Sequence, residues 1–258
     1  ALTVSLATPA RAEWPQRLTA NGNIMAWQEA IVGAEASGLR LTEIHANVGD
    51  RVRKGQLLAT LQNETLGAEL EQVSASLAEA EAALAEASAN AERARKIEGK
   101  GALSAQQVAQ YLTAEKTAQA RCAALQAQLK STRIRLSQTR IVAPDDGTIT
   151  SRTATLGAVV QPGTELFRLI RKNRLEWRAE LPAADLARIQ PGMTVKVITA
   201  SKNALRGKVR MVAPSVDAQT RNGLVYVDLL ETTNALAGSF ARGEIELARS
   251  GVLTLPQS

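Results

Sequence analysis

The chain has 258 residues, a formal charge of +6 and a single cysteine, Cys122. Its length predicts two or more modules, and one cysteine excludes an intramolecular disulfide. The basic residues are dispersed, and aromatic residues make up only 3% of the chain, which argues against a nucleic-acid-binding surface. No run of about 18 apolar residues indicates a transmembrane helix.

The first 62 residues predict β structure. Residues 2–7 alternate apolar and polar side chains, as a half-buried strand does, and Pro9 ends this strand. Residues 13–32 contain further strand-like runs, which we expect Gly22 to interrupt. Residues 35–61 predict short strands separated by turns that need a residue tolerant of positive φ. The glycines at these turns are Gly38, Gly49 and Gly55.

Residues 63–138 form an alanine-rich run that predicts two long helices separated by a short break at residues 99–103. Apolar residues of the first arm recur at alternating steps of four and three, which is typical of a coiled-coil seam. They are Leu66, Leu70, Val73, Leu77, Ala80, Leu84, Ala87, Ala91 and Ala94. The second arm carries a looser copy: Val108, Tyr111, Glu115, Ala118, Cys122, Leu125, Leu129, Thr132 and Leu136. The short break predicts an antiparallel helical hairpin.

Strand-like sequence returns after the hairpin. Residues 143–147 predict a turn that ends at Gly147, and strands follow through Leu169. A shift of 108 positions aligns the segment before the hairpin with the segment after it. The aligned pairs are Val48 with Leu156, Gly49 with Gly157, Val52 with Val160, Gly55 with Gly163, Leu58 with Leu166, and Leu61 with Leu169. Because each half is too small to bury a core, we expect the two to pair into one flattened β-sandwich that the hairpin interrupts.

The remaining residues, 175–247, alternate as several short strands do, with one short helix expected from Pro182 to Ile189. Together with residues 14–32 they predict a small β-barrel. Val252 begins a further strand-like run.

This order of parts resembles the periplasmic adaptor, or membrane fusion protein, family (HlyD-like) of tripartite efflux pumps, most closely its RND-type adaptors. The resemblance implies an elongated, multi-domain α+β fold: a long antiparallel coiled-coil hairpin inserted in a split lipoyl-like sandwich, a small β-barrel, and remnants of a membrane-proximal β domain. The expected boundaries are an edge strand at 1–10, barrel parts at 11–33 and 172–248, lipoyl-like halves at 34–62 and 140–171, the hairpin at 63–139, and the start of the truncated membrane-proximal domain at 249–258.

The same resemblance implies an adaptor that links an inner-membrane RND-type transporter to an outer-membrane TolC-like channel. It would export drugs, toxic compounds or metal ions, lie in the periplasm in association with the inner membrane, and self-associate as a hexamer or a trimer of dimers. An alternative within the class is an adaptor of a type I secretion system or an ABC-type exporter. A different class is a biotinyl or lipoyl carrier-like scaffold of a metabolic complex.

Adaptors that dock to TolC-like channels carry Arg, Leu and Ser near the hairpin tip. In this chain Arg93 and Ser104 occupy the outer positions, and Ile97 replaces the Leu. Ser104 together with Gln107 also predicts a capping box at the start of the second helix. The first arm is rich in Glu and the second in Lys and Arg, from which we hypothesise that complementary arms set the packing of neighbouring protomers.

The remaining chemistry of the chain argues against an enzyme. A lipoyl or biotinyl carrier needs a modifiable Lys on the turn that the hairpin replaces, so we expect no covalent cofactor. His45 is the only histidine, and Met25, Met193 and Met211 are scattered, so we expect no metal site. No nucleophile–base pair or carboxylate dyad is evident.

Overall fold

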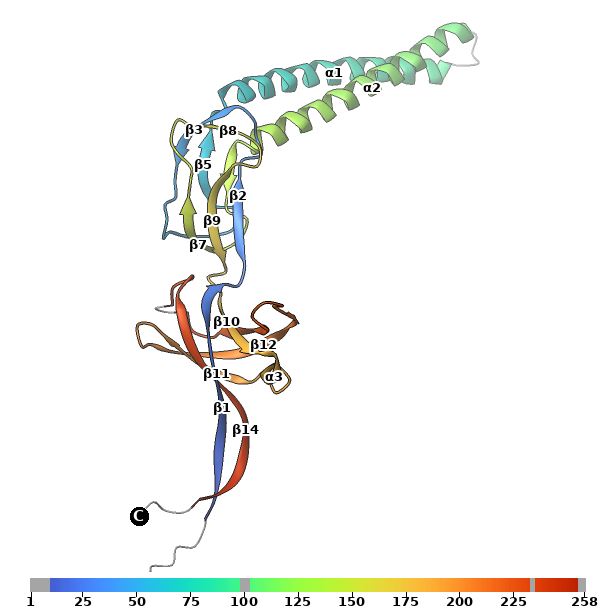
Figure 1. Ribbon diagram of the computed structural model, residues 1–258. Helices are drawn as coiled ribbons and strands as arrows, with labels where there is room; N and C mark the ends of the chain where they lie inside the picture. The colour runs from blue at the N-terminus through green and yellow to red at the C-terminus, as the bar shows by residue number, and fades with distance from the viewer. Residues whose placement is uncertain (1–9, 98–102, 233–234, 255–258) are drawn as a thin grey trace, which may run out of the picture. The chain divides into compact units, whose positions relative to one another are not determined.

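The computed structural model describes residues 10–97, 103–232 and 235–254 (Figure 1). The chain divides into two compact units. The first consists of Ala1–Ala30, Asp145–Thr150 and Leu169–Ser258, and the second of Ile31–Pro144 and Ser151–Arg168. In the described part of the chain, no helix is long and apolar enough to cross a bilayer.

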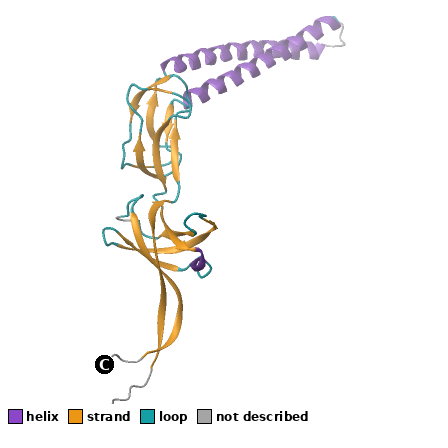
Figure 2. Cartoon of the chain, viewed as in Figure 1, coloured by secondary structure: helices purple, strands orange, loops and turns teal. Residues whose placement is uncertain are grey.

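The first unit contains a closed six-stranded barrel, in the order β1-β10-β13-β12-β11-β14 (Figure 2). Alternating side chains point into it, and Trp177, which is fully buried, is the largest of them. This confirms the predicted barrel and the contribution of the early residues to it. Its strands are β1 (Ala10–Ala26), β10 (Leu175–Pro182), β11 (Thr194–Thr199), β12 (Ala204–Val216), β13 (Asn222–Leu229) and β14 (Phe240–Thr254).

Two local predictions for this unit were wrong. β1 continues through Gly22 without interruption, because Gly22 serves a close approach rather than a turn: a Cβ there would lie 1.9 Å from the carbonyl oxygen of Arg178. The helix expected from Pro182 to Ile189 is only one turn, α3 (Ala183–Leu186), and the chain then turns as Arg188 N–H donates to the Asp185 carbonyl.

β1 and β14 pair along most of their length. Residues 252–254, predicted as the start of a strand, form the end of β14 and pair with residues 10–12 of β1. The strand predicted at residues 2–7, and Pro9 after it, lie outside the described residues.

Two four-stranded sheets form the predicted sandwich, in the orders β2-β9-β7-β4 and β6-β5-β3-β8. The repeat is confirmed, since a shift of 108 residues carries β3 onto β7, β4 onto β8 and β5 onto the first residues of β9. Each sheet therefore combines strands from both halves. The strands are β2 (Glu29–Gly33), β3 (Leu39–Ile44), β4 (Arg51–Val52), β5 (Leu57–Leu61), β6 (Arg140–Val142), β7 (Gly147–Arg152), β8 (Val159–Val160) and β9 (Glu165–Arg171).

The repeat extends to burial and backbone conformation. Val52 and its counterpart Val160 are both buried, whereas the equivalent Val48 and Leu156 are both exposed. Positive φ occurs at the expected turn glycines, which are Gly38, Gly49, Gly55, Gly157 and Gly163. Gly147 does not share this conformation. It begins β7, where a Cβ would lie 2.2 Å from the Ile170 carbonyl oxygen.

The two long helices α1 (Glu64–Ile97) and α2 (Ala105–Ser137) lie side by side (Figure 1). They run antiparallel, because Glu69 near the start of α1 pairs with Arg135 near the end of α2, and Arg95 near the end of α1 pairs with Glu115. The predicted helical arms are therefore present. Coiled-coil packing between them stays a prediction.

The predicted seam residues are those that the helices turn toward each other. Val73, Ala80, Ala91, Ala94, Val108, Cys122, Leu129 and Thr132 are buried. Leu66, Leu70, Leu77, Leu84, Ala87, Glu115, Ala118, Leu125 and Leu136 are half-buried. Tyr111 is the exception at 40% exposure, consistent with a phenol that keeps its hydroxyl in water.

Candidate functional site

The candidate site is the end of the helical pair, on either side of residues 98–102, which lie outside the described residues. Arg93 is exposed on the last turns of α1, and its guanidinium donates to the Asn90 side-chain oxygen. Ile97 is the last residue of α1 and is half-buried. Ser104 immediately precedes α2 and is exposed.

Ser104 forms the predicted capping box. Gln107 N–H donates to the Ser104 hydroxyl oxygen at 3.3 Å, and Ser104 N–H donates to Gln107 Oε1 at 3.1 Å. These bonds satisfy N–H groups that an α-helix leaves without partners in its first turn. The hydroxyl is therefore used within its own helix, and any docking role would be additional.

The charges at this end of α1 are unequally compensated. Arg95 pairs with Glu115, and Lys96 pairs with Glu92 at 2.7 Å. A hydrogen bond from Lys96 and its positive charge hold the pKa of Glu92 below its usual range. Arg93 differs, because its hydrogen-bond partner, Asn90, is neutral. Arg93 therefore presents an uncompensated positive charge at the surface.

Charges along the arms were hypothesised to pair between neighbouring protomers. Two of the opposite-charge pairs are instead made within the chain, from Arg135 to Glu69 and from Arg95 to Glu115. They connect α1 to α2 and so stabilise the helical pair itself. The remaining charged residues of the arms keep the hypothesis open.

His45 illustrates the residue types that could bind a metal. Its Nε2 lies 3.2 Å from a Glu43 carboxylate oxygen and 3.2 Å from the Thr60 hydroxyl. Within the described ranges, no group of three or more His, Cys, Asp or Glu side chains could hold a metal ion. Cys122 is a buried free thiol in the seam.

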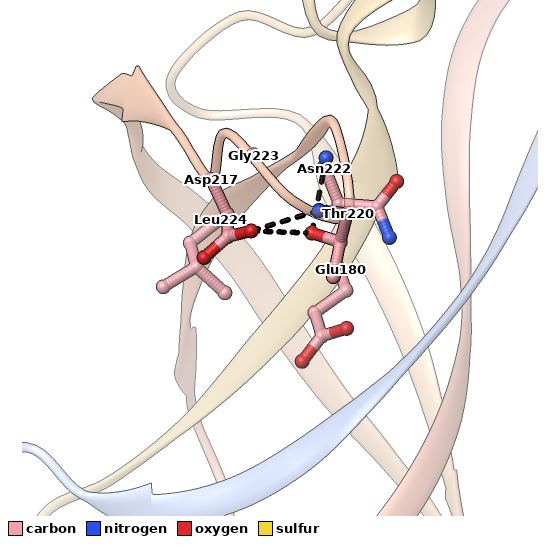
Figure 3. A pocket seen from close by; sticks show the side chains of 6 residues that line it. All are labelled: Glu180, Asp217, Thr220, Asn222, Gly223 and Leu224. Atoms are coloured by element: carbon pink, nitrogen blue, oxygen red, sulfur yellow. Dashed lines mark hydrogen bonds between the residues drawn. The ribbon is translucent and has the colours of Figure 1, made fainter.

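The barrel contains a hollow that the sequence gave no reason to expect (Figure 3). Its residues are Glu180, Asp217, Thr220, Asn222, Gly223 and Leu224. Asp217 accepts hydrogen bonds from the backbone N–H groups of Thr220 at 2.8 Å and Gln219 at 2.9 Å, which lower the pKa of its carboxyl. The Thr220 hydroxyl lies 3.2 Å from the same oxygen. These contacts fix the connection between β12 and β13, so we assign the hollow a structural role.

A second unpredicted feature is a cluster of arginines around Trp27 in the first unit. The Arg174 guanidinium lies 4.4 Å from the centre of the Trp27 ring, and that of Arg171 lies 6.0 Å away. Arg171 also pairs with Asp145 at 2.6 Å, and Arg174 pairs with Asp228 at 2.6 Å. The cluster combines cation–π contacts with ion pairs and fixes the segments on either side of the β9–β10 turn.

Residues 28–170 match the family model of the CzcB-like, barrel-sandwich hybrid domain. The chain is 29% identical over 234 residues to the nickel-cobalt-cadmium resistance protein NccB of Alcaligenes xylosoxydans xylosoxydans, covering 89% of this chain and 58% of that protein. It is 31% identical over 237 residues to the pyoverdine export membrane fusion protein PvdR of Pseudomonas putida, covering 82% of this chain and 58% of that protein. The chain thus spans about 58% of the length of these curated relatives.

The fold is shared with solved adaptors. The structure of MacA from Actinobacillus actinomycetemcomitans superposes with a TM-score of 0.70 at 22% identity, covering 96% of this chain and 84% of that one. The match with the family model includes both halves of the sandwich and both long helices, which together contain the candidate site. The chain belongs to the membrane fusion protein family and carries its CzcB-like barrel-sandwich hybrid domain.

Proposed function

We propose that the protein is a non-enzymatic periplasmic adaptor that links an inner-membrane RND-type transporter to an outer-membrane TolC-like channel. The observation that carries this proposal is the antiparallel helical pair inserted between the two halves of the sandwich. At a rise of about 1.5 Å per residue, the 34 residues of α1 reach about 50 Å, a useful span between two membrane proteins.

Each part then has a role. The end of the helical pair, with Arg93, Ile97 and Ser104, contacts the channel. The barrel and a membrane-proximal domain hold the transporter, and the sandwich takes part in self-association as a hexamer or a trimer of dimers. The exposed, uncompensated Arg93 supports the tip assignment, because a guanidinium can donate several hydrogen bonds to the carboxylates or carbonyls of another helical end.

The exported substrates are proposed to be metal ions, drugs or other small toxic compounds. Of the relatives, NccB is named for resistance to nickel, cobalt and cadmium, and PvdR for pyoverdine export. Because the chain lacks a cluster of metal ligands among its described residues, we assign the choice of substrate to the transporter.

Deletion of the gene in its host, followed by growth on nickel, cobalt, cadmium and a panel of drugs, tests the adaptor role. We expect sensitivity to at least one of these classes and rescue by the full-length gene. Arg93→Glu is expected to abolish rescue, because it reverses the charge at the tip. Arg133→Glu, which changes an exposed arginine of α2 far from the tip, serves as a matched control and is expected to rescue. Full rescue by Arg93→Glu would contradict the docking role of the tip.

Two alternatives are separated by other measurements. Capture of partners by the tagged full-length protein distinguishes an RND-type transporter from an ABC-type exporter or a type I secretion system. Intact-mass analysis of the protein from its host tests the carrier-like scaffold, since a lipoyl or biotinyl adduct would overturn the adaptor role.

A further inference from the structure

The sandwich has two edge strands, β2 and β6, that border one hollow. β2 is the outer strand of one sheet and β6 is the outer strand of the other. The hollow measures about 240 Å³, with Val32 and Ile141 buried in its floor. Its rim is formed by Ile31, Gly33, Glu35, Arg140, Val142 and Pro144.

These edges carry exposed aliphatic side chains. Ile31 is 58% exposed and Val142 is 40% exposed. An edge strand also leaves backbone N–H and C=O groups without a neighbouring strand, and such edges readily pair with another chain. Exposed apolar residues on two open edges beside one hollow therefore indicate an interaction surface.

The inner sides of the two edges are bonded in the same way. Ala34 donates to Thr164 at 3.0 Å and accepts from Gly163 at 2.9 Å. Ala143 donates to Gln56 at 2.9 Å and accepts from Gly55 at 2.8 Å. The internal repeat thus makes Ala34 and Ala143 equivalent and gives the two edges a similar outward face.

The two edges differ in charge. Glu35 follows β2 and is exposed, and Arg140 begins β6 and is exposed. No ion pair or hydrogen bond joins either side chain to another described residue. One edge therefore carries an acidic group and the other a basic group, with apolar residues beside each.

We propose that these edges bind a second copy of this chain about a two-fold axis, β2 of each copy pairing antiparallel with β6 of the other. If Gly33 lies opposite Val142 of the second copy, the same register places Glu35 opposite Arg140 and Ile31 opposite Pro144. Glycine leaves room for the valine, and the opposite charges attract. Because both edges border one hollow, a single two-fold operation makes both contacts, and each sheet continues into a sheet of the second copy.

Self-complementarity favours a second copy over a foreign peptide. A lone extended peptide would satisfy one edge and leave the other open. The proposed pair rests on the self-association in the proposed function and names its two-fold contact. Its test uses the purified chain without transporter or channel, so its failure would leave the adaptor role standing.

Cysteine crosslinking tests the register. Cys122→Ser removes the only native thiol, and two single variants, Ile31→Cys and Pro144→Cys, are made in that background with tags of different size. We expect the oxidised mixture to form the mixed disulfide dimer several-fold above a control mixture. The control pairs Pro144→Cys with Val48→Cys, because Val48 is as exposed as Ile31 at 58%. Equal yields from the two mixtures would overturn the proposal.

A charge exchange gives a second, independent readout. Glu35→Arg and Arg140→Glu each place like charges opposite each other, and each is expected to weaken dimerisation by about tenfold or more in analytical ultracentrifugation. The chain carrying both substitutions restores opposite charges and is expected to dimerise like the parent. Far-UV circular dichroism verifies folding of all three variants. A double variant as weak as either single one, or a parent that stays monomeric at every concentration tested, would refute the two-fold pairing.

Discussion

Gly243 and Trp177 depend on each other in the barrel core. Trp177 is fully buried, and its indole N–H donates to the Ala241 carbonyl oxygen at 3.3 Å. A Cβ on Gly243 would lie 2.3 Å from the indole ring. The largest side chain of the core therefore occupies space that only glycine on β14 leaves open.

Gly243→Ala is expected to lower the free energy of unfolding by about 1–3 kcal/mol, the usual cost of overpacking a core. Gly67→Ala is the matched control, since Gly67 lies in α1 with no atom near its would-be Cβ. Alanine favours the helix, so this control is expected to raise stability by up to about 1 kcal/mol. Urea unfolding of both variants measures the difference, and equal effects would contradict the packing argument.

Asp145 makes the stability of the chain depend on pH. Hydrogen bonds from Arg171 Nη2 at 2.6 Å and Nε at 2.9 Å, and then one from Asp146 N–H at 2.9 Å, hold the pKa of this carboxyl below its ordinary value of 3.8. Because the pKa is depressed in the folded chain, the stabilisation is present above pH 3.8 and is lost as pH falls through the folded pKa.

Asp145→Asn is therefore expected to be less stable than the parent at neutral pH and to approach it as the solution is acidified below pH 3.8. Denaturant unfolding of both chains across this range measures the convergence. A difference in stability that stays constant with pH would show that the carboxylate charge is not involved.

The elements show how the hairpin is built. Its seam alternates Leu with Ala, and the fully buried Ala91 shows how closely α1 and α2 approach each other near the tip. Two inter-arm ion pairs supplement this packing. The capping box then fixes where α2 begins, three residues before Gln107.

Ser104→Ala is expected to cost about 1 kcal/mol of stability through loss of the N-cap. Ser104→Asp keeps a good N-cap and is expected to retain most of that stability. The pair separates the two roles of this position. If Ser104→Asp is stable but fails to rescue a deletion strain, the hydroxyl serves docking as well; if both variants rescue fully, its role is limited to the cap.

At the scale of the molecule, the two units have separate cores. The barrel core is formed by residues of the first unit, with Trp177 as its largest member. The sandwich core of the second unit includes Leu41, Leu58 and Leu61, which are buried. Units that each bury their own apolar residues can unfold as separate cooperative units.

Scanning calorimetry is expected to resolve two transitions. Gly243→Ala should lower the midpoint of one of them, and Leu58→Ala, which removes a fully buried side chain of the sandwich, should lower the other. A single transition that both variants shift would show that the two units unfold together.

The predictable part of the molecule is the part written in local patterns. Seam spacing, the short break between the arms and the offset of 108 residues all repeat within the sequence, because helix and strand periodicity place side chains on fixed faces. These patterns identified both long helices, the sandwich and the capping box at Ser104. For the candidate site, they placed Arg93 and Ile97 at the end of α1.

Other features depend on residues far apart in the chain. Gly22 looked like a strand break, and only its proximity to the Arg178 carbonyl shows why a strand needs glycine there. The arginines around Trp27, and the open edges of β2 and β6 at one hollow, arise from strand order, which no local periodicity encodes. The sequence alone determined the elements and their repeat, while the tertiary structure decided which edges stay open, because strand pairing is set by the packing of the whole sheet.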